Sequence, residues 1–499
     1  MKTGDILELT IESLGFGGEG VAKVEDFVIF VKGGLPGQVV KAVISKKKKS
    51  HAEARITEII KRTPEEIEAK CAHFGSCGGC KWQNLLYEKQ LSFKQQQVTD
   101  CLEHIAKMKT PPVLPILSSP QQFGYRNKVE FSFGYANMSI DKTDDEKWVY
   151  HDEDPTLGFH KAGKWESVVN IDHCDLISEG MNTVFTRIKE WCLSQDKDVY
   201  NQKTNQGFWR QVVMRENHKG EILLNIVTTT GEPFEFFESL RPLLVELNIQ
   251  SCFLTFFDGV NSYWPDGLIQ HFAGDEFIFE EVLGQTFCIS PESFFQTNTK
   301  GAEVLYSEVI RLLKDVPSKS ILDLYCGTGT IGQVVAGADK KKHIIGVELL
   351  ESAVEDAEDN AKRNGLENVA YFAGKAEKIL PEILEQFPKF DVLIIDPPRA
   401  GMHPKARKLL SEMGVKNCVY ISCNPSTKDG YFETLLLSTV DDNLKKCYDE
   451  FLDCIEFKNK SHHKYIMEQL HKLTSPEKPY DFSSDNFKEL KDKLIKIFQ

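Results

Sequence analysis

The sequence lacks both a long apolar run and an apolar N-terminal stretch. No run of about 18 apolar residues is present, so no membrane-spanning helix is expected. The first residues, MKTGDILELT, include acidic side chains where a signal peptide would need an apolar core. We therefore expect a cytoplasmic protein.

An excess of positive charge is also missing. Lysine and arginine total 60 against 74 acidic residues, which gives a net charge of −14. This balance argues against a general nucleic-acid coat protein, although local basic patches, not the average charge, bind phosphate. One such patch comprises lysines 46–49 with Lys41 and Arg55 nearby. The patch fits RNA binding and an ordinary solvated loop about equally well.

Internal repeats and low-complexity tracts are absent, and 41% hydrophobic with 27% charged residues is an ordinary globular composition. The length of 499 residues corresponds to two to four domains. We predict a multi-domain α/β protein. Its expected parts are a small β-barrel, a central mostly antiparallel α+β domain that begins with a cysteine-rich segment, a Rossmann-like domain, and a linker with one amphipathic helix: residues 1–62, 63–290, 291–470 and 471–499.

Local patterns support these divisions. Residues 1–62 contain short β-rich runs separated by the glycine turns GFGGEG and GGLPGQ. A helix is expected around 84–105, and strands with turns dominate 120–290. From 291 to 470, apolar strands alternate with amphipathic helices, which is typical of a parallel sheet.

A cofactor site is indicated by ILDLYCGTGTIG (321–332), a strand that enters a glycine turn and then a helix. Glycine lets the backbone approach a ligand closely, and a helix N-terminus follows. The next strand, IIGVE, ends at Glu348, where an acid suits a ribose diol. This pattern alone also suits a nicotinamide enzyme. The later strand FDVLIIDPPRAG (390–401) shifts the interpretation to S-adenosylmethionine.

A candidate nucleophile, Cys423, follows the strand in VYISCNPST (419–427). A cysteine at the carboxyl end of a parallel strand lies over the ligand crevice. Carbon 5 of uracil is a poor nucleophile, but a thiolate that adds to carbon 6 makes it reactive toward a methyl donor. A lone cysteine is more often a buried hydrophobe, but Asn-Pro after it and DPPR one strand earlier favour a chemical role.

Together these motifs make the chain resemble the bacterial RNA 5-methyluridine methyltransferases, most closely the 23S ribosomal RNA branch with a TRAM domain and an iron–sulfur cluster. The resemblance covers about residues 1–430 and rests on GFGGEGVAK, CGGCKWQ, YRNKVEFSF, LGFH, FFQTN, DLYCGTGTIG, GVELLESAV, DPPRAG and SCNPST. It implies transfer of a methyl group to carbon 5 of a uridine, with RNA as partner and no protein partner indicated. A transfer RNA uridine is the alternative target.

The resemblance also implies roles for individual residues. Cys423 would be the nucleophile, and Asp396 would lie beside the methyl donor and the target base. S-adenosylmethionine would contact Asp396 and four further residues: Gln296, Tyr325, Thr330 and Glu348. Arg126 and Asn127 of YRNK would contact RNA or support the fold.

Thirteen cysteines are many for a cytosolic protein, where disulfides are rare. Cys71, Cys77 and Cys80 form C-x₅-C-x₂-C, and Cys174 lies about 100 residues later. Thiolates suit iron–sulfur clusters or zinc, and spacing alone does not separate the two. The resemblance implies a [4Fe–4S] cluster on these four cysteines, with a structural role.

One expected feature is missing after the nucleophile. The family usually has F-P-x-T-x-H-x-E there, and its glutamate removes the carbon-5 proton. Here DCIEFKNKSHHKYIMEQL (453–470) places Tyr465 at the glutamate position, and tyrosine is a poor base at neutral pH. Three interpretations stay open: another base, with His463 or Glu468 as candidates; an altered C-terminus and an impaired enzyme; or an RNA-binding protein that turns over poorly.

Overall fold

The computed structural model describes residues 1–104, 113–142, 148–260, 267–398 and 401–424. Two compact units are distinguished, of which the first contains Met1–Ala400 and Asn417–Thr427. The helix α8 (Pro404–Glu412) belongs to the second unit. None of the described helices is both long and apolar enough to cross a bilayer.

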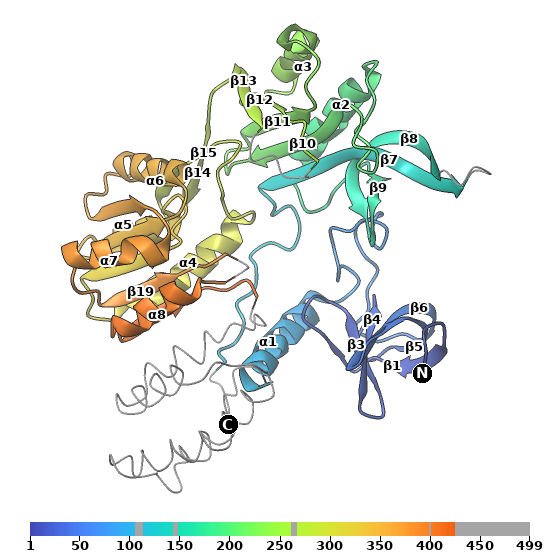
Figure 1. The fold of residues 1–499 in the computed structure, drawn as a ribbon, viewed down its shortest axis with the longest axis horizontal. Coiled ribbons are helices and arrows are strands. Elements are labelled where there is room, and N and C mark those ends of the chain that lie inside the picture. The colour runs from blue at the N-terminus through green and yellow to red at the C-terminus, as the bar shows by residue number, and fades with distance from the viewer. Residues whose placement is uncertain (105–112, 143–147, 261–266, 399–400, 425–499) are drawn as a thin grey trace, which may run out of the picture. The chain divides into compact units, whose positions relative to one another are not determined.

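The N-terminal residues form one six-stranded sheet in the order β1-β5-β6-β4-β3-β2 (Figure 1). Alternate residues of its strands are buried, as in β5, where Val40, Ala42 and Ile44 face the core. The predicted β-rich character of this region is confirmed. The strands are β1 (Ile6–Thr10), β2 (Ser13–Leu14), β3 (Gly20–Val24), β4 (Phe27–Lys32), β5 (Val39–Lys47) and β6 (His51–Lys61).

The basic patch lies at the end of β5 and in the turn that follows, and its lysines are exposed. Acidic partners offset part of its charge, because Lys48 pairs with Glu53 at 2.8 Å and Lys41 with Glu58 at 2.8 Å. Exposed pairs of this kind contribute little to stability and stay available to a competing phosphate.

The predicted helix is α1 (Tyr87–His104), which begins three residues later than expected and extends to the last described residue of this range. Its one buried side chain, Gln97, donates from Nε2 to the carbonyl oxygens of Leu14 and Gly15, each at 3.0 Å. These bonds satisfy backbone groups at the end of β2 and attach the helix to the turn between β2 and β3.

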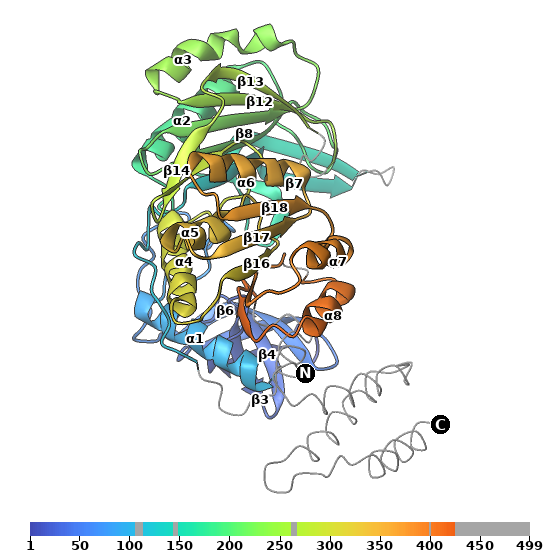
Figure 2. The ribbon, with the colours of Figure 1, turned by 90° about the vertical axis from the view of Figure 1, so that its left-hand side faces the viewer.

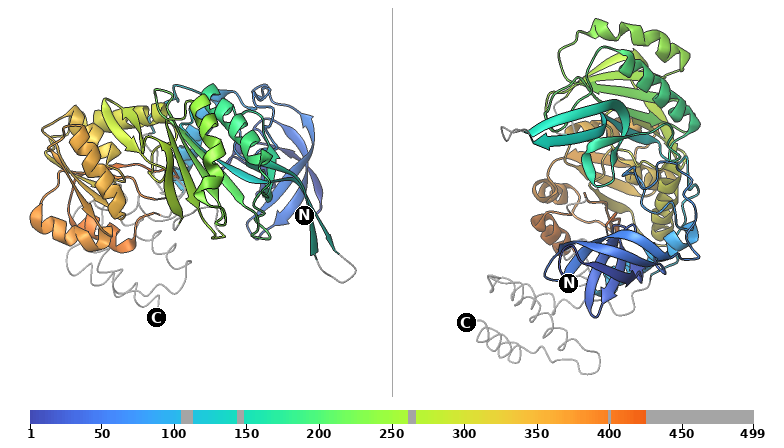
Figure 3. Two further views of the ribbon diagram at one scale, coloured as in Figure 1. Left: turned by 90° about the horizontal axis from the view of Figure 1, so that it is seen from above. Right: turned by 90° about the vertical axis from the view of Figure 1, so that its right-hand side faces the viewer.

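The central sheet has seven strands in the order β13-β12-β11-β10-β7-β8-β9. It is antiparallel as predicted except for one pair, since β11 and β12 run parallel with a helical crossover between them. Strands β7 and β8 extend together beyond the rest of the sheet as a two-stranded arm (Figure 3). The elements are β7 (Lys128–Lys142), β8 (Trp148–Lys161), β9 (Lys164–Asn170), α2 (Glu179–Ser194), β10 (Trp209–Glu216), β11 (Ile222–Thr228), η1 (Phe234–Leu240), α3 (Arg241–Glu246), β12 (Ser251–Phe256) and β13 (Leu268–Gly274).

A hairpin of β14 (Ile278–Val282) and β15 (Gln285–Ile289) leads into a loop and then α4 (Thr299–Lys314). Five parallel strands follow in the order β18-β17-β16-β19-β20. Helices α4 and α5 lie on one side of this sheet and α7 on the other (Figure 2). The elements are β16 (Ser320–Leu324), α5 (Thr330–Ala338), β17 (His343–Glu348), α6 (Glu351–Arg363), β18 (Val369–Ala373), α7 (Ala376–Gln386), β19 (Val392–Ile395) and β20 (Asn417–Tyr420).

The predicted Rossmann-like sheet is therefore present. Its inner strands are buried on both faces: Val392–Ile395 is fully buried, and Ile321–Leu324 likewise. Because β16 lies between β17 and β19, the strand order reverses at β16. In sheets of this class, the crevice at such a reversal binds ligands at the carboxyl ends of the strands.

Candidate functional site

Four predicted site residues lie at the carboxyl edge of the parallel sheet. Tyr325 follows β16, Glu348 ends β17, Asp396 follows β19, and Cys423 lies three residues beyond β20. The register joins these ends directly, since the Asp396 amide donates to the Leu324 carbonyl at 3.4 Å and the Ile421 amide to the Ile395 carbonyl at 2.9 Å. Parallel pairing thus gathers residues that lie up to 98 positions apart in the chain.

The glycine turn after β16 has the conformation that a close backbone approach requires. Tyr325, Gly327 and Gly329 have φ angles of 65°, 55° and 77°, and Gly329 caps α5. A Cβ on Gly329 would lie 2.6 Å from the Tyr371 hydroxyl, so no larger residue fits there. Thr330 is the first residue of α5, and its hydroxyl lies 3.3 Å from that of Thr328.

Glu348 is held at the end of β17 by backbone donors. Its carboxylate accepts from the Gly327 amide of the glycine turn at 3.1 Å and from the Leu349 amide at 2.6 Å. Leu349 and Leu350 follow and are 55% and 61% exposed. The sequence interpretation overlooked these two leucines, although an apolar pair directly after an acidic strand end is the signal that would have drawn attention to them.

Gln296 lies in the loop between β15 and α4, and the central domain fixes that loop. The Asn127 side-chain amide donates to the Gln296 carbonyl and to the Thr299 hydroxyl, each at 2.8 Å. The buried Arg215 guanidinium donates to the carbonyls of Pro291 and Ser293, and burial lowers its pKa to about 10. Asn127 therefore supports the fold here, which was one of its two expected roles.

Two residues of the same region add to the site. The Gln296 side chain bonds the buried hydroxyl of Tyr306, whose pKa is raised by burial and then by the charges of Asp396 and Asp323. Gln296 is therefore bonded to a tyrosine whose hydroxyl senses the charge of Asp396. Phe294, two positions before Gln296, is 72% exposed. Sequence reasoning missed Phe294, although an exposed aromatic side chain beside polar groups is typical of a base-binding surface.

Burial perturbs the two carboxyl groups beneath the crevice. Desolvation raises the pKa of Asp396 to about 6. Desolvation, and then the charge of Asp396, raises the pKa of the fully buried Asp323 to about 7, while the Gly332 amide donates to its Oδ2 at 3.0 Å. Perturbed carboxyl groups in a cleft are typical of functional sites.

Cys423 is exposed and lies in a short turn after β20. The Ser422 hydroxyl accepts from the Asn424 amide at 3.2 Å and donates to the Asn424 carbonyl at 3.1 Å. These two bonds fix the backbone on either side of Cys423. An accessible thiol can react, whereas a buried structural thiol is inert.

The four predicted metal-ligand cysteines line one pocket: Cys71, Cys77, Cys80 and Cys174. The cysteine-rich segment reaches the central domain through backbone bonds, including Gly78 N to His160 O at 3.0 Å and Ala162 N to Ser76 O at 2.9 Å. The tertiary structure therefore joins a local cysteine motif to a distant cysteine. Arg126 lines the same pocket.

The thiols of this pocket have donors directed at sulfur. The Gly79 amide lies 3.4 Å from Cys77 Sγ, and Gln83 Nε2 lies 3.2 Å from Cys80 Sγ. Burial, and the neighbouring sulfurs, raise the pKa of Cys174 to about 11. Neutral thiols are favoured until a cation compensates the thiolate charge, and hydrogen bonds to sulfur are typical of iron–sulfur sites.

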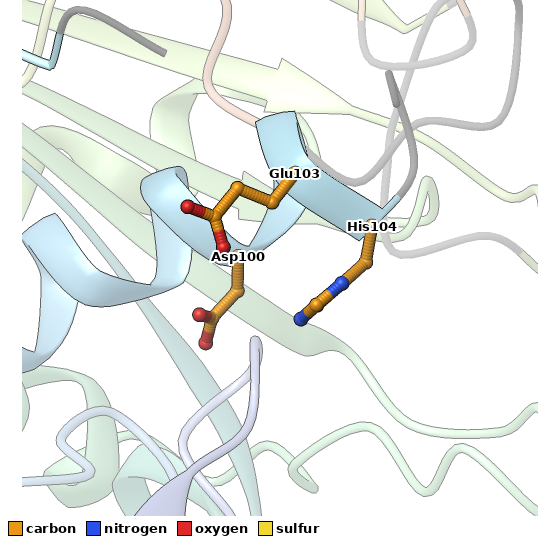
Figure 4. Close-up of side chains that lie close together, drawn as sticks. All are labelled: Asp100, Glu103 and His104. Carbon is orange, nitrogen blue, oxygen red and sulfur yellow. The ribbon is translucent and has the colours of Figure 1, made fainter. Parts of the chain in front are cut away.

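A second group of ligand-type side chains lies on the last turns of α1: Asp100, Glu103 and His104 (Figure 4). Their ligand atoms lie within 4.8 Å of one another, and within the described ranges this is the only such group of three or more. All three are exposed, and positions i, i+3 and i+4 meet on any helix face. We assign them no role.

Several predicted residues fall outside the described part of the chain. These include Arg399 of DPPR, the candidate bases His463 and Glu468, Tyr465 at the glutamate position, and the helix predicted within 471–499.

The fold and strand-end site define an S-adenosylmethionine-dependent methyltransferase attached to an N-terminal β-sheet domain. Residues 315–473 match a family model described as a methyltransferase domain, and residues 1–57 match the TRAM domain. An uncharacterized RNA methyltransferase of Caldanaerobacter subterraneus is 40% identical, with 86% of this chain and 91% of the relative covered. An uncharacterized RNA methyltransferase of Clostridium tetani is 38% identical, with 86% of this chain and 90% of the relative covered. The chain belongs to this family of TRAM-containing RNA methyltransferases.

A solved structure is also similar over most of the chain. It is the Pyrococcus abyssi tRNA (uracil-54, C5)-methyltransferase in complex with S-adenosyl-L-homocysteine. It is 26% identical, its TM-score is 0.64, and the match covers 86% of this chain and 93% of that structure. The likeness therefore extends over most of both chains.

Proposed function

We propose that this enzyme methylates carbon 5 of a uridine in 23S ribosomal RNA through a covalent adduct with Cys423. The observation that carries the proposal is the position of an exposed thiol at the same sheet edge as the glycine turn and Asp396. A methyltransferase that acts on a base nitrogen or a hydroxyl has no need of a thiol at that edge.

The chemistry follows from the electron demand of uracil. The Cys423 thiolate adds to carbon 6, and the electron pair of the 5,6 double bond moves into an enolate. When bound, S-adenosylmethionine supplies the methyl group as an electrophilic sulfonium, and carbon 5 takes that group. A base then removes the carbon-5 proton, the double bond re-forms, and the thiolate leaves. We propose His463 or Glu468 as that base.

The cofactor is proposed to lie across the glycine turn. Glu348 would accept hydrogen bonds from the ribose hydroxyls, and the exposed Leu349 and Leu350 offer an apolar surface for the adenine. Tyr325 in the glycine turn and Thr330 at the N-terminus of α5 would contact the rest of the cofactor. Gln296, held from Asn127 and Tyr306, would complete the site on the side of the methyl donor.

Asp396 is proposed to act as a carboxylate beside the donor and the base. Because its pKa is about 6, the ionised form is lost as pH falls through 6. We expect kcat/KM to fall up to tenfold per pH unit below that value, since the free enzyme must hold the charge. Asp396→Asn should lower the rate by about 10²–10³-fold and abolish this acid limb. An acid limb unchanged in Asp396→Asn would exclude the role.

The cysteine pocket is proposed to hold a [4Fe–4S] cluster through Cys71, Cys77, Cys80 and Cys174. Four cysteine thiolates suit a zinc ion as well as an iron–sulfur cluster, and the resemblance to the iron–sulfur branch of the family is what favours the cluster. It would fasten the cysteine-rich segment to the central domain, and no step of methyl transfer requires a redox centre.

The second candidate substrate is a transfer RNA uridine, which the similarity to the Pyrococcus abyssi enzyme favours. The experiment that separates the two is transfer from labelled S-adenosylmethionine to unmodified 23S ribosomal RNA and transfer RNA side by side, with anaerobically purified protein. We expect incorporation into the ribosomal RNA. Incorporation into transfer RNA alone would show that the substrate is transfer RNA and not 23S ribosomal RNA. No incorporation with the cofactor bound would favour an impaired enzyme or an RNA-binding role.

A further inference from the structure

A pocket of about 350 Å³ lies beside Cys423 and contains none of the residues assigned to the cofactor. Phe16 from the turn between β2 and β3, Trp82 from the cysteine-rich segment and Lys94 from α1 line it, and Cys423 lies on its wall. The GFGGEG turn meets Lys81 and Trp82 of CGGCKWQ here, and the methyl-transfer site uses neither of these segments. The size is that of a site for a small molecule or a single nucleotide.

The walls of this pocket are held together by specific bonds. Trp82 Nε1 donates to the Gly18 carbonyl at 3.1 Å, and the Lys81 ammonium donates to the Gly17 carbonyl. A Cβ on Gly18 would lie 2.9 Å from Lys81 Cδ and 3.0 Å from Trp82 Nε1, so the turn packs as closely as backbone allows. The Trp82 wall and the backbone of the turn that carries Phe16 are therefore fixed before any ligand arrives, which lowers the entropic cost of binding.

The aromatic and cationic side chains of the pocket indicate which kind of ligand it binds. Phe16 is 48% exposed, and the Lys94 ammonium lies 6.0 Å from the centre of the Trp82 ring. Aromatic faces with adjacent cations bind unpaired nucleobases by stacking and their phosphates by charge. Because Cys423 lies on the wall of the pocket, two consecutive nucleotides of one RNA strand can occupy the two positions, one in the pocket and the other beside Cys423.

We propose that this pocket holds the nucleotide adjacent to the target uridine, with its base stacked on Phe16 and its phosphate near Lys81 and Lys94. The proposal rests on the proposed function, because it uses Cys423 as the position of the target. It would make Phe16 and Lys94 positioning residues that help to extrude the uridine from the strand.

The test is binding of a 12-nucleotide single-stranded RNA that contains one uridine, with 2-aminopurine placed on either side in turn. The full chain is used without S-adenosylmethionine, so that binding stays reversible. We expect wild-type protein to quench 2-aminopurine on one side only. Phe16→Ala should remove the quenching and raise the Kd by roughly 5–100-fold, the effect of one lost stacked base. Lys94→Ala should raise the Kd and make it less dependent on salt.

Two controls keep the outcome interpretable. Phe277→Ala removes a 39% exposed aromatic side chain outside the pocket and should bind as wild type does. Trp82→Phe loses the bond to Gly18 but keeps an aromatic face, and should retain most binding. An unchanged Kd in Phe16→Ala, or no binding by wild type, would overturn the pocket assignment. A parallel incubation with S-adenosylmethionine and the same RNA carrying 5-fluorouridine separates the two proposals. Phe16-dependent binding without any 5-fluorouridine adduct there would retain the pocket and instead remove the proposed role of Cys423.

Discussion

Replacement of Cys423 by alanine is expected to lower the rate of methyl transfer by roughly 10⁴-fold or more, because the thiolate that we propose to add to carbon 6 of uracil would be missing. The same change should abolish the gel-stable adduct that wild type forms with 5-fluorouridine RNA, in which fluorine replaces the proton that elimination requires. The measurement is methyl incorporation from labelled S-adenosylmethionine together with denaturing electrophoresis of the RNA–protein mixture.

A matched control comes from the same strand. Cys418 lies in β20, five residues before the proposed nucleophile Cys423, and burial raises its pKa to about 11. Cys418→Ala should keep adduct formation, since a protonated thiol within the sheet does not react. An adduct that persists in Cys423→Ala would show that another residue is the nucleophile. Unchanged cofactor binding in both variants would confirm that the sheet edge is intact.

Replacement of Cys77 by serine is expected to remove the iron of anaerobically purified protein, from about four atoms per chain to less than one, together with its brown colour. A serine hydroxyl is a poor ligand for iron in such clusters, and the donors around Cys77 and Cys80 suit sulfur that carries negative charge. The measurement is metal analysis for iron and zinc with assay of acid-labile sulfide. The thermal midpoint should also fall, since the cluster would cross-link segments about 100 residues apart.

Cys288→Ser is the control for this experiment. Cys288 lies in β15 outside the pocket, and burial raises its pKa to about 11. Its replacement should leave iron content unchanged. If Cys77→Ser retained its iron, the proposed cluster site would be wrong. If the wild-type protein contained stoichiometric zinc and no acid-labile sulfide, the pocket would be a zinc site.

Several features could be predicted because their physical causes are local. Apolar β-rich runs with glycine turns specify the strands of the first sheet, and alternating strands and amphipathic helices specify the parallel sheet. Gly327 and Gly329 adopt the positive φ angles that the turn requires, so the turn that we propose to bind the cofactor could be located from the sequence. The residues that come directly after the strands could also be expected to lie near one another, because parallel strands end at the same edge of the sheet.

Other features depend on contacts that no local pattern contains. The parallel pair β11–β12 arises because η1 and α3 form a crossover, which a region rich in strands and turns did not suggest. The positions of Asn127 and Arg215 around the Gln296 loop depend on partners 76 to 172 residues away in the chain. The phenylalanine at 294 gained its significance only from its exposure.

The sequence by itself determined the types of secondary structure and the family of methyltransferases to which the chain belongs, and it is the basis of the chemistry that we propose for the thiol at 423. The tertiary structure alone decided which groups share an environment. It gathers Cys174 with three cysteines of a distant segment, it raises the pKa of Asp396 to about 6 by burial, and it sets Phe16 and Trp82 in one pocket with Cys423. Desolvation and long-range proximity depend on the packed chain as a whole, whereas propensity and reactivity belong to residues and their near neighbours.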